Sequence, residues 1–410
     1  MPYTPPHPWL ETLAYRSAQP LIGLACQLVW RARVTGQEYI ATSDGPLLVL
    51  PNHTSMFDPL WVGYYSWRRL GAMASAQLFR YAFLSKVIGA FGAFPKAKFV
   101  KDRDAMRHMQ RTWDMGHAIL IFPEGTRSWD GRTQRVIPGI GRLIKRMDAR
   151  VVYCRIKTGH LHHPRWAKYP RWVPIHLEFD GPHSYSDLEA ADIDDEVSER
   201  IQIDPVQAVD GRCWGWRMAH GFPAFMWGCP ACNGFDALDI HPQDGNAVLC
   251  GDCGAGWRLD PFNRMHPMEG TPVAGEPVES VVVQRDRFIG RLGTPPIKHS
   301  ALLESEGILL REAGQIGRVT RSKTPDVLAQ GILTLTREEL QVVDEHGEVA
   351  WTVDLKTLVA VSLELAGVLQ IRAQDGLYIQ LMPDTGATMK WGHFVAHWAK
   401  AAGAEKLRFG

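Results

Sequence analysis

The sequence predicts an α/β protein in which a mostly parallel sheet with flanking helices is followed by a small cysteine-rich module and a mainly antiparallel β domain. Three observations support this prediction. Apolar strand-like and helix-like runs alternate between Pro46 and Phe179, two Cys-x-x-C pairs follow, and short strands occupy the last third of the chain. Alternating strands and helices are typical of a parallel sheet, whose functional side chains lie where the strands end.

Composition and charge define the class of protein. The chain has 410 residues, of which 45% are hydrophobic and 22% are charged, enough for two or three folded domains with cores of their own. The net charge of +1 conceals a division, because residues 1–175 carry 25 Lys and Arg against 10 Asp and Glu. That basic part predicts an anionic partner, such as phosphate groups, a membrane surface or nucleic acid.

The elements of the α/β region, predicted to span 35–205, follow one another at short intervals. The expected strands are 46–50, 71–76, 118–122, 150–156 and 173–179, and the expected helices are 59–70, 77–90, about 105–115 and 137–147. An acidic segment, 184–200, closes the region.

The N-terminal segment contains a charge-free apolar stretch, Ser17–Trp30, of 14 residues. A membrane-spanning helix needs about 20 residues, so this stretch is expected to lie in a core or in the membrane interface. The first 30 residues lack the basic start and cleavage site of a secretory signal, and the paired cysteines predict a reducing cytosol.

The last third is predicted to form a strand meander. The expected strands are 332–336, 339–344, 348–353, 357–364, 367–373 and 377–382, with turns at 345–347 and 374–376. Trp391, Phe394 and Trp398 then share one face of a closing helix. The outline resembles a PH-like or GRAM-like domain over 279–410, preceded by a connecting helix and cysteine module at 206–260 and a linker at 261–278.

The stretch "PLLVLPNHTSMFDPLWVG" places His53 at the exit of a buried strand and Asp58 five residues later. One interpretation is local: Asp58 and Pro59 start a helix, and His53 is an ordinary loop residue. The other is chemical. Five residues are about 140° apart on a helix, so the pair cannot share a helical face, but a turn could direct Asp58 at one imidazole nitrogen and leave the other free as a general base.

A second polar cluster, Pro123–Ser128 ("PEGTRS"), also follows a predicted strand. Arg127 is a planar, permanently charged donor suited to phosphate. Glu124 and Arg127 could alternatively form a surface ion pair. Two such clusters at strand exits favour a joint functional site.

The blocks "NHTSMFD" and "FPEGTRS" resemble the first and third signature blocks of the glycerolipid acyltransferases of the lysophosphatidate acyltransferase type. The resemblance covers about residues 35–185. The resemblance implies the glycerolipid acyltransferase fold. It also implies direct transfer of an acyl group from acyl-CoA or acyl-carrier protein to a lysolipid hydroxyl, without an acyl-enzyme intermediate. It further implies that His53 deprotonates the hydroxyl, that Asp58 orients His53, and that the acceptor phosphate is bound by Glu124, Gly125, Thr126 and Arg127.

Two further blocks depart from the family pattern. The second block usually carries an arginine, and here the candidate substrate-binding residues are Lys96, Lys98 and Arg103. The fourth usually carries a proline, where this chain has "VVYCRIKTG". Both blocks shape the substrate pockets, so they bear on which acceptor is used.

The cysteines Cys229, Cys232, Cys250 and Cys253 have the spacing Cys-x2-Cys-x17-Cys-x2-Cys, which predicts a structural Zn²⁺ site. The presence of two matched Cys-x2-Cys pairs favours a metal site over a redox-active cysteine pair. Zinc ribbons often bind nucleic acid, but residues 228–260 carry one basic residue, Arg258, against five aspartates. Because nucleic-acid binding needs a basic footprint, we exclude it here.

The predicted function is acyl transfer to a lysophospholipid, most simply 1-acylglycerol 3-phosphate, at the cytoplasmic face of a membrane. The family implies that residues 1–34 are membrane-docking helices, broken at Pro20, which attach peripherally rather than span. Two alternatives stay open: the same chemistry on glycerol 3-phosphate or another hydroxylated lipid, and a non-catalytic lipid-binding scaffold. The C-terminal domains could contact a protein partner.

Overall fold

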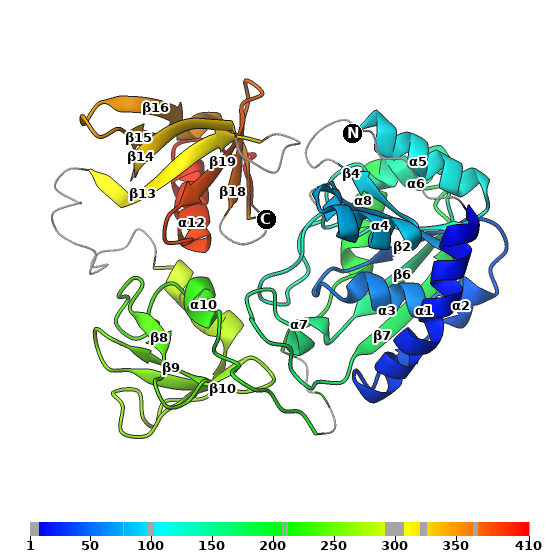
Figure 1. Ribbon diagram of the computed structural model, residues 1–410, viewed down its shortest axis with the longest axis horizontal. Helices are drawn as coiled ribbons and strands as arrows, with labels where there is room; N and C mark the ends of the chain where they lie inside the picture. The colour runs from blue at the N-terminus through cyan, green and yellow to red at the C-terminus, as the bar shows by residue number, and fades with distance from the viewer. Residues whose placement is uncertain are drawn as a thin grey trace. The chain divides into compact units, whose positions relative to one another are not determined.

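The computed structural model describes residues 8–76, 78–96, 102–206, 209, 212–291, 307–319, 326–363 and 368–409 (Figure 1). The chain divides into two compact units. The first unit contains Met1–Trp216 together with Asp260–Asn263, and the second contains Arg217–Leu259 together with Arg264–Gly410.

The first unit is built on a seven-stranded sheet in the order β1-β7-β6-β2-β5-β3-β4. Its elements are α1 Pro8–Leu28, β1 Arg33–Thr35, α2 Glu38–Ala41, β2 Leu48–Pro51, α3 Asp58–Tyr65, β3 Leu70–Ser75, the 3-10 helix η1 Leu78–Arg80, α4 Ala82–Ala90, β4 Ala93–Lys96, α5 Arg103–Asp114, β5 Ala118–Leu120, α6 Ile140–Met147, β6 Val151–Ile156, α7 Gly159–His162, β7 His176–His183 and α8 Ala190–Arg200. Strands β6, β2, β5, β3 and β4 run parallel, whereas β7 is antiparallel to β6 and pairs in parallel with β1. The predicted α/β fold with a mostly parallel sheet is confirmed.

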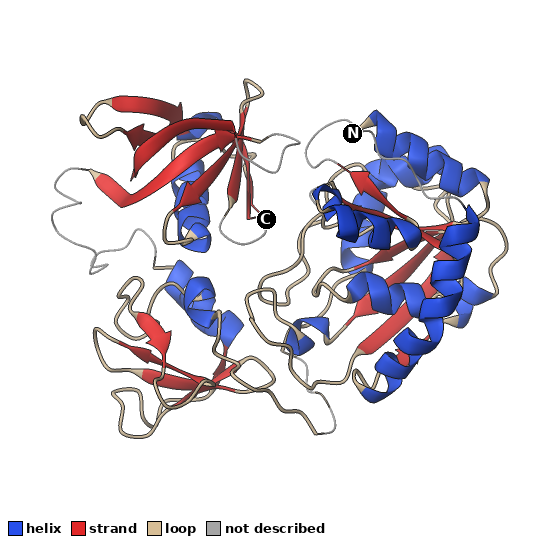
Figure 2. Cartoon of the chain, viewed as in Figure 1, coloured by secondary structure: helices blue, strands red, loops and turns tan. Residues whose placement is uncertain are grey.

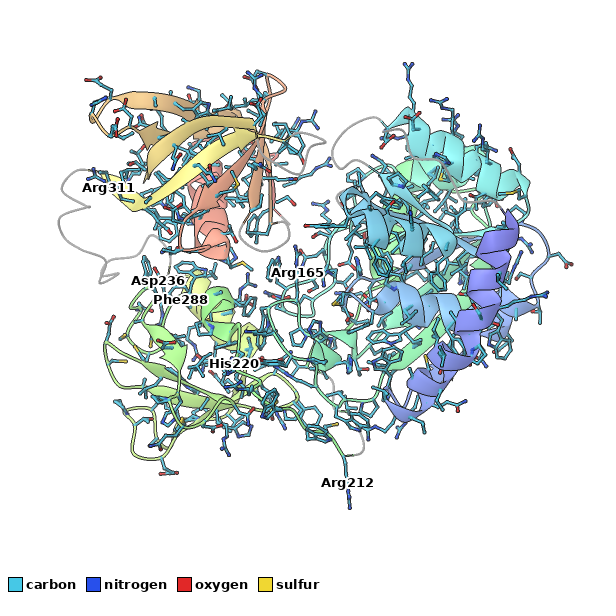
Figure 3. All side chains as sticks on the ribbon, in the orientation of Figure 1. Arg165, Arg212, His220, Asp236, Phe288 and Arg311 are labelled. Atoms are coloured by element: carbon cyan, nitrogen blue, oxygen red, sulfur yellow. The ribbon has the colours of Figure 1, made fainter. Side chains whose placement is uncertain are left out.

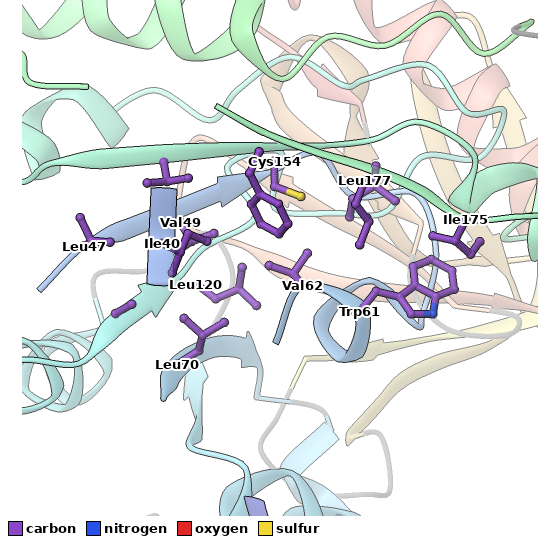
Figure 4. Packing of buried hydrophobic residues seen from close by; sticks show 14 of the residues in the cluster. Ile40, Leu47, Val49, Trp61, Val62, Leu70, Leu120, Cys154, Ile175 and Leu177 are labelled. Atoms are coloured by element: carbon purple, nitrogen blue, oxygen red, sulfur yellow. The ribbon is translucent and has the colours of Figure 1, made fainter. Parts of the chain in front are cut away.

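Both faces of this sheet are covered by helices (Figure 2). On β2, Val49 joins one buried cluster with Trp61 of α3, and this cluster is shown in Figure 4. Its neighbour Leu48 joins the opposite cluster with Ile144 of α6 and Ile193 of α8. Successive strand residues point to opposite faces, which explains why this strand is an unbroken apolar run rather than an alternating one.

The N-terminal segment differs from the predicted helix pair. A single helix, α1, continues through Pro20. Proline removes one backbone hydrogen bond from a helix, but Pro20 is exposed, so water can satisfy the carbonyl group that loses its partner. Within the part of the chain that the structure describes, no helix has both the length and the apolar character needed to cross a membrane.

The segment Asp260–Asn263 belongs to the first unit although its neighbours on both sides belong to the second. It is held by Arg171, whose side chain is almost fully buried. The Nη1 atom of Arg171 donates to Asn263 Oδ1 at 2.6 Å and to the Pro261 carbonyl at 3.3 Å. A buried guanidinium requires such acceptors, so this short segment is part of the interior of the first unit.

The second unit contains a five-stranded and an eight-stranded sheet, ordered β12-β11-β10-β9-β8 and β16-β15-β14-β13-β19-β18-β17-β20. Its elements are α9 Phe222–Phe225, β8 Leu238–Ile240, β9 Ala247–Cys250, β10 Gly256–Leu259, β11 Arg264–Pro267, β12 Glu279–Ser280, α10 Val281–Ile289, β13 Ile308–Arg318, β14 Asp326–Thr336, β15 Glu339–Val343, β16 Val349–Asp354, the 3-10 helix η2 Leu355–Thr357, β17 Leu358–Leu363, β18 Leu369–Ala373, β19 Tyr378–Pro383, α12 Thr388–Ala401 and β20 Arg408–Phe409. Pairing in the larger sheet is antiparallel except between β17 and β20. The predicted antiparallel C-terminal region is confirmed.

The stretch predicted as a linker, 261–278, instead contributes β11 to the smaller sheet. Met265 of this strand is fully buried, and its packing explains why so short a segment is ordered. The segment that precedes β8 is also tied to α12: Trp227 Nε1 donates to His393 Nδ1 at 2.9 Å, and Lys390 forms an ion pair with Asp236.

Two helical glycines give a matched test of packing in the first unit. A Cβ atom added at Gly141 of α6 would lie 2.0 Å from the carbonyl oxygen of Ala190 in α8, whereas one at Gly63 of α3 would meet nothing within 4 Å. We expect Gly141→Ala to lower the free energy of unfolding by about 1–3 kcal/mol through overpacking. Gly63→Ala should raise it by about 0.5–1 kcal/mol, because alanine is the better helix former.

Hydrogen exchange of peptides from the first unit across a urea series measures both changes in the full-length chain. Equal effects of the two substitutions would contradict the close contact of α6 with α8.

Candidate active site

The position of His53 is fixed by the backbone on both sides of it. Asn52, directly after β2, is fully buried. Its Nδ2 donates to the Ile156 carbonyl at 3.2 Å, and its Oδ1 accepts from the Ile156 N–H at 2.6 Å, which joins the ends of β2 and β6. The carbonyl of His53 accepts from the Ser128 N–H at 2.8 Å. The exit of β2 is therefore held by β6 and by the loop that follows β5.

Asp58 binds the imidazole of His53 across a tight turn. Its Oδ2 lies 2.9 Å from His53 Nδ1 and also accepts from the backbone N–H groups of Thr54 at 2.6 Å and Ser55 at 2.8 Å. The side chain of Asp58 is fully buried and forms no cap to α3, whose N-cap is Phe57. Of the two interpretations of His53 and Asp58, the structure agrees with the one in which a turn directs Asp58 at the imidazole ring. A carboxylate at Nδ1 favours the tautomer in which Nε2 carries the lone pair.

The surroundings of His53 favour its neutral form. Burial lowers its pKa below the ordinary value of 6.5; Asp58 opposes this effect, while the positive charges of Arg127 and Arg165 add to it. The ring stacks on Phe122 with centroids 3.9 Å apart, yet the side chain keeps 18% of its surface exposed. His53 thus combines a neutral imidazole with access from solvent, as a general base requires.

Glu124 belongs to the predicted loop and is almost fully buried. Its two carboxylate oxygens accept from the backbone N–H groups of His53 and Gln134. Burial raises the pKa of Glu124 to about 8, although these two donors lower it. With both oxygens engaged, Glu124 anchors the backbone of His53 instead of presenting its carboxylate at the surface.

The other residues of the predicted loop follow Glu124 in the chain. Gly125 has a φ of 69°, in the left-handed region, and a Cβ there would lie 2.2 Å from Ile137 Cδ1. Only glycine fits both requirements without strain. Thr126 and Arg127 follow and are partly exposed.

Arg165 is a site residue that sequence reasoning did not single out (Figure 3). Its Nη1 donates to Thr126 Oγ1 at 2.9 Å and to the Arg127 carbonyl at 2.6 Å, and its guanidinium lies 4.0 Å above the ring of Trp129. Arg165 lies in the basic and aromatic segment 160–172. No local pattern distinguishes it there, because its partners are some 38 residues away in sequence.

The candidates from the second block lie farther from His53. Lys96 ends β4, three strands from β2, so the carboxyl ends of these strands are about 14 Å apart. Burial lowers the pKa of Lys96. Arg103 is the exposed first residue of α5, and Lys98 lies outside the described residues. Lys96 shares the sheet edge of His53 but could reach only the far part of an extended substrate.

The four predicted cysteine ligands converge in the second unit. The four sulfur atoms lie within 4.8 Å of one another, and the pairs Cys229–Cys253 and Cys232–Cys250 are separated by 3.9 and 3.8 Å. Metal–sulfur bonds of about 2.3 Å in a tetrahedron place sulfur atoms about 3.8 Å apart. The cluster therefore fits a tetrahedral metal such as zinc, with no coordination position left open.

Comparison with known proteins places the site blocks in a family domain. The model of the family described as Acyltransferase matches residues 31–157, so the chain contains an acyltransferase-family domain. Among solved structures, the chain is similar to the 1-acyl-sn-glycerophosphate (LPA) acyltransferase PlsC from Thermotoga maritima. That match has 19% sequence identity and a TM-score of 0.38, and it covers 47% of this chain and 78% of the other.

The cysteine cluster predicts a bound metal in the purified full-length chain. We expect about one metal equivalent per chain, measured by elemental analysis, because four thiolates complete one tetrahedral shell. Cys250→Ser should lose the metal and destabilise the second unit, since metal binding contributes directly to folding. Cys213→Ser is the matched control and should keep the metal, because Cys213 lies outside the cluster. Equal metal content in both variants would contradict the assignment.

Proposed function

We propose that the first unit transfers an acyl group from acyl-CoA or acyl-carrier protein to the free hydroxyl of a lysophospholipid, most simply 1-acylglycerol 3-phosphate, to give phosphatidate. The observation that carries this proposal is the pairing of His53 with buried Asp58 at the sheet edge, beside the guanidinium groups of Arg127 and Arg165. The acyltransferase-family match over residues 31–157 supports the reaction class.

In the proposed reaction, His53 Nε2 accepts the proton of the acceptor hydroxyl as its oxygen attacks the thioester carbonyl carbon. Asp58 stabilises the imidazolium that forms, because its Oδ2 faces Nδ1. The carbon–sulfur bond then breaks, and the departing thiolate takes the proton from His53. The products are an ester and a free thiol, and no acyl-enzyme is needed.

An acceptor phosphate is proposed to bind at the loop of Gly125, Thr126 and Arg127. Arginine suits this task because its planar fork matches phosphate oxygens. Arg165 is proposed to act as a positioning residue, since its Nη1 binds Thr126 Oγ1 and the Arg127 carbonyl and thereby fixes the loop. Glu124 is proposed to hold the same loop against the backbone of His53.

A lipid substrate implies contact with a membrane surface, and two adjacent helices support this. Helix α1 exposes Leu21, Leu24 and Leu28 at helical spacing, and α4, which packs beside it, exposes Phe83 and Val87. Large exposed apolar side chains on neighbouring helices are typical of interfacial attachment. We propose that this α1–α4 face docks on the bilayer peripherally.

The metal of the cysteine cluster is proposed to be Zn²⁺ in a structural role. Four thiolates favour zinc and leave no position for a substrate or a reactive water. The ion would hold the smaller sheet of the second unit together, and the acyl-transfer steps would not involve it.

His53→Ala tests the proposed base. Purified chain would be given vesicles containing 1-acylglycerol 3-phosphate and acyl-CoA, with thiol release and phosphatidate formation followed together. We expect a loss of about 10²–10⁴-fold in rate for His53→Ala. His117→Ala is the matched control, because His117 precedes β5 at the opposite edge of the sheet, and it should retain the rate.

Two outcomes of that experiment would revise the proposal. Turnover only with glycerol 3-phosphate, another hydroxylated lipid or acyl-carrier protein would keep the chemistry and change the substrate. Absence of turnover with every donor and acceptor, from protein that is folded and metal-loaded, would favour a lipid-binding scaffold.

The acid limb of the pH–rate profile gives an independent test. His53 must be neutral to act as a base, and its pKa is lowered below 6.5, so kcat/KM should rise with pH along a limb whose midpoint lies below pH 6.5. Arg165→Met removes a positive charge that disfavours the imidazolium. The pKa of His53 should therefore rise, and the acid limb should move to higher pH.

Arg107→Met is the control for charge, because Arg107 is exposed on α5 and lies outside the site. It should leave the limb in place. If the acid limb of the pH–rate profile stays in place in Arg165→Met, the charge of Arg165 does not act on His53.

A further inference from the structure

Two segments of the first unit bring four aromatic side chains together. Trp172 and Trp214 form an antiparallel bridge, in which each backbone N–H donates to the other's carbonyl, at 2.8 and 3.3 Å. Their rings stack with centroids 5.9 Å apart, and the rings of Tyr169 and Trp216 are 5.0 Å apart. We name these four residues the Trp214 cluster.

The Trp214 cluster is exposed to solvent to an unusual degree. Trp214 has 56% and Trp216 has 58% of its surface exposed, whereas Trp30, Trp61 and Trp166 of this unit are buried. The backbone pairing holds the segments in place without burying these rings. Exposed aromatic groups gathered in one place mark an interaction surface more often than a folding requirement.

Cationic side chains flank the cluster. The guanidinium of Arg31 lies 5.8 Å from the ring of Trp172, and its Nη2 donates to the Arg212 carbonyl at 2.8 Å. The ammonium of Lys168 lies 5.9 Å from the ring of Tyr169. Arg212 itself is exposed and extends outward from its loop (Figure 3). Tryptophan and tyrosine beside lysine and arginine match the headgroup layer of a bilayer, where rings meet the acyl boundary and cations meet phosphate.

The cluster is also continuous in sequence with the proposed membrane-docking helix. Leu28 ends α1, Val29 follows, both are exposed, and Arg31 comes two residues later. The exposed apolar side chains of α1 thus lead directly to the cation that contacts Trp172. This continuity, and the flanking positive charge, favour an anionic lipid surface over a neutral glycan or a protein as the occupant.

We propose that the Trp214 cluster, flanked by Arg31, Lys168 and Arg212, is a second membrane anchor that binds the headgroup layer of bilayers containing anionic phospholipid. The inference extends the membrane attachment put forward under the proposed function but does not depend on catalysis. The α1–α4 face would insert apolar side chains, whereas this cluster would bind at the level of the phosphates.

The test measures cosedimentation of the full-length chain with sucrose-loaded vesicles of phosphatidylcholine, with and without phosphatidylglycerol. Trp214→Ser/Trp216→Ser should weaken binding to the anionic vesicles by about tenfold or more, because two large apolar side chains no longer enter the interface. Trp67→Ser, which alters an equally exposed tryptophan (56%) outside the cluster, is the matched control and should bind as the natural chain does.

Arg212→Glu provides a second variant that leaves the aromatic packing intact. It should weaken binding to the anionic vesicles by about fivefold or more and leave binding to pure phosphatidylcholine unchanged. Circular dichroism melting of each variant separates loss of binding from loss of folding. Unchanged binding to anionic vesicles in both variants, or an equal loss in Trp67→Ser, would overturn the proposal.

Turnover of a short-chain, water-soluble lysophosphatidate separates this inference from the proposed function. The cluster variants should turn it over at the rate of the natural chain, since a dissolved substrate needs no membrane anchor. If the natural chain shows no turnover with any donor and acceptor but the vesicle results hold, the acyltransferase proposal fails and the anchor stands. A loss of soluble turnover in the folded variants would overturn the assignment of these residues to membrane binding alone.

Discussion

The carboxylate of Asp58 organises the candidate active site through three hydrogen bonds made by one oxygen atom. Oδ2 faces the ring of His53 and accepts from the backbone of Thr54 and Ser55, so it shapes the turn that presents the ring. A buried carboxylate without such donors would be costly, which means that the turn and the imidazole orientation stabilise each other. The same residue is the first of α3, so the turn that presents the ring leads directly into this helix.

The parallel sheet supplies the remaining geometry. The ends of β2 and β5 are adjacent, and this adjacency brings the loop of Glu124 to Arg127 against the backbone of His53. Glu124 joins the two segments through the backbone of His53, and Arg165 joins the loop to the segment after α7. A site assembled from three separate loops is rigid only because each loop is bonded to a neighbour, and the observed contacts provide such bonds.

Much of this architecture was predictable from sequence. Apolar runs of strand length predicted β2, β5 and β6, and cysteine spacing predicted the convergence of the four cysteines. The two signature blocks singled out His53, Asp58 and Arg127, whose roles stay predictions. Predictions succeeded where the signal is local or where spacing is dictated by coordination chemistry. Arg165 and β11 depend on partners distant in sequence, which periodicity does not encode. The basic and aromatic segment 160–172 was recognisable as a candidate for a lipid headgroup interface or a solvated loop, but its pairing with Trp214 and Trp216 was not. The continuation of α1 through Pro20 depends on solvent reaching one carbonyl group.

Because of the short segment Asp260–Asn263, neither unit is one continuous stretch of the chain. The polypeptide passes from the first unit to the second, returns for four residues, and leaves again. A chain ending at Trp216 would keep every residue of the candidate active site but would deprive the buried guanidinium of Arg171 of its acceptor on Asn263. The first unit of this protein is therefore not a transplantable module: its interior is completed by residues that the ribosome adds only after the four clustered cysteines.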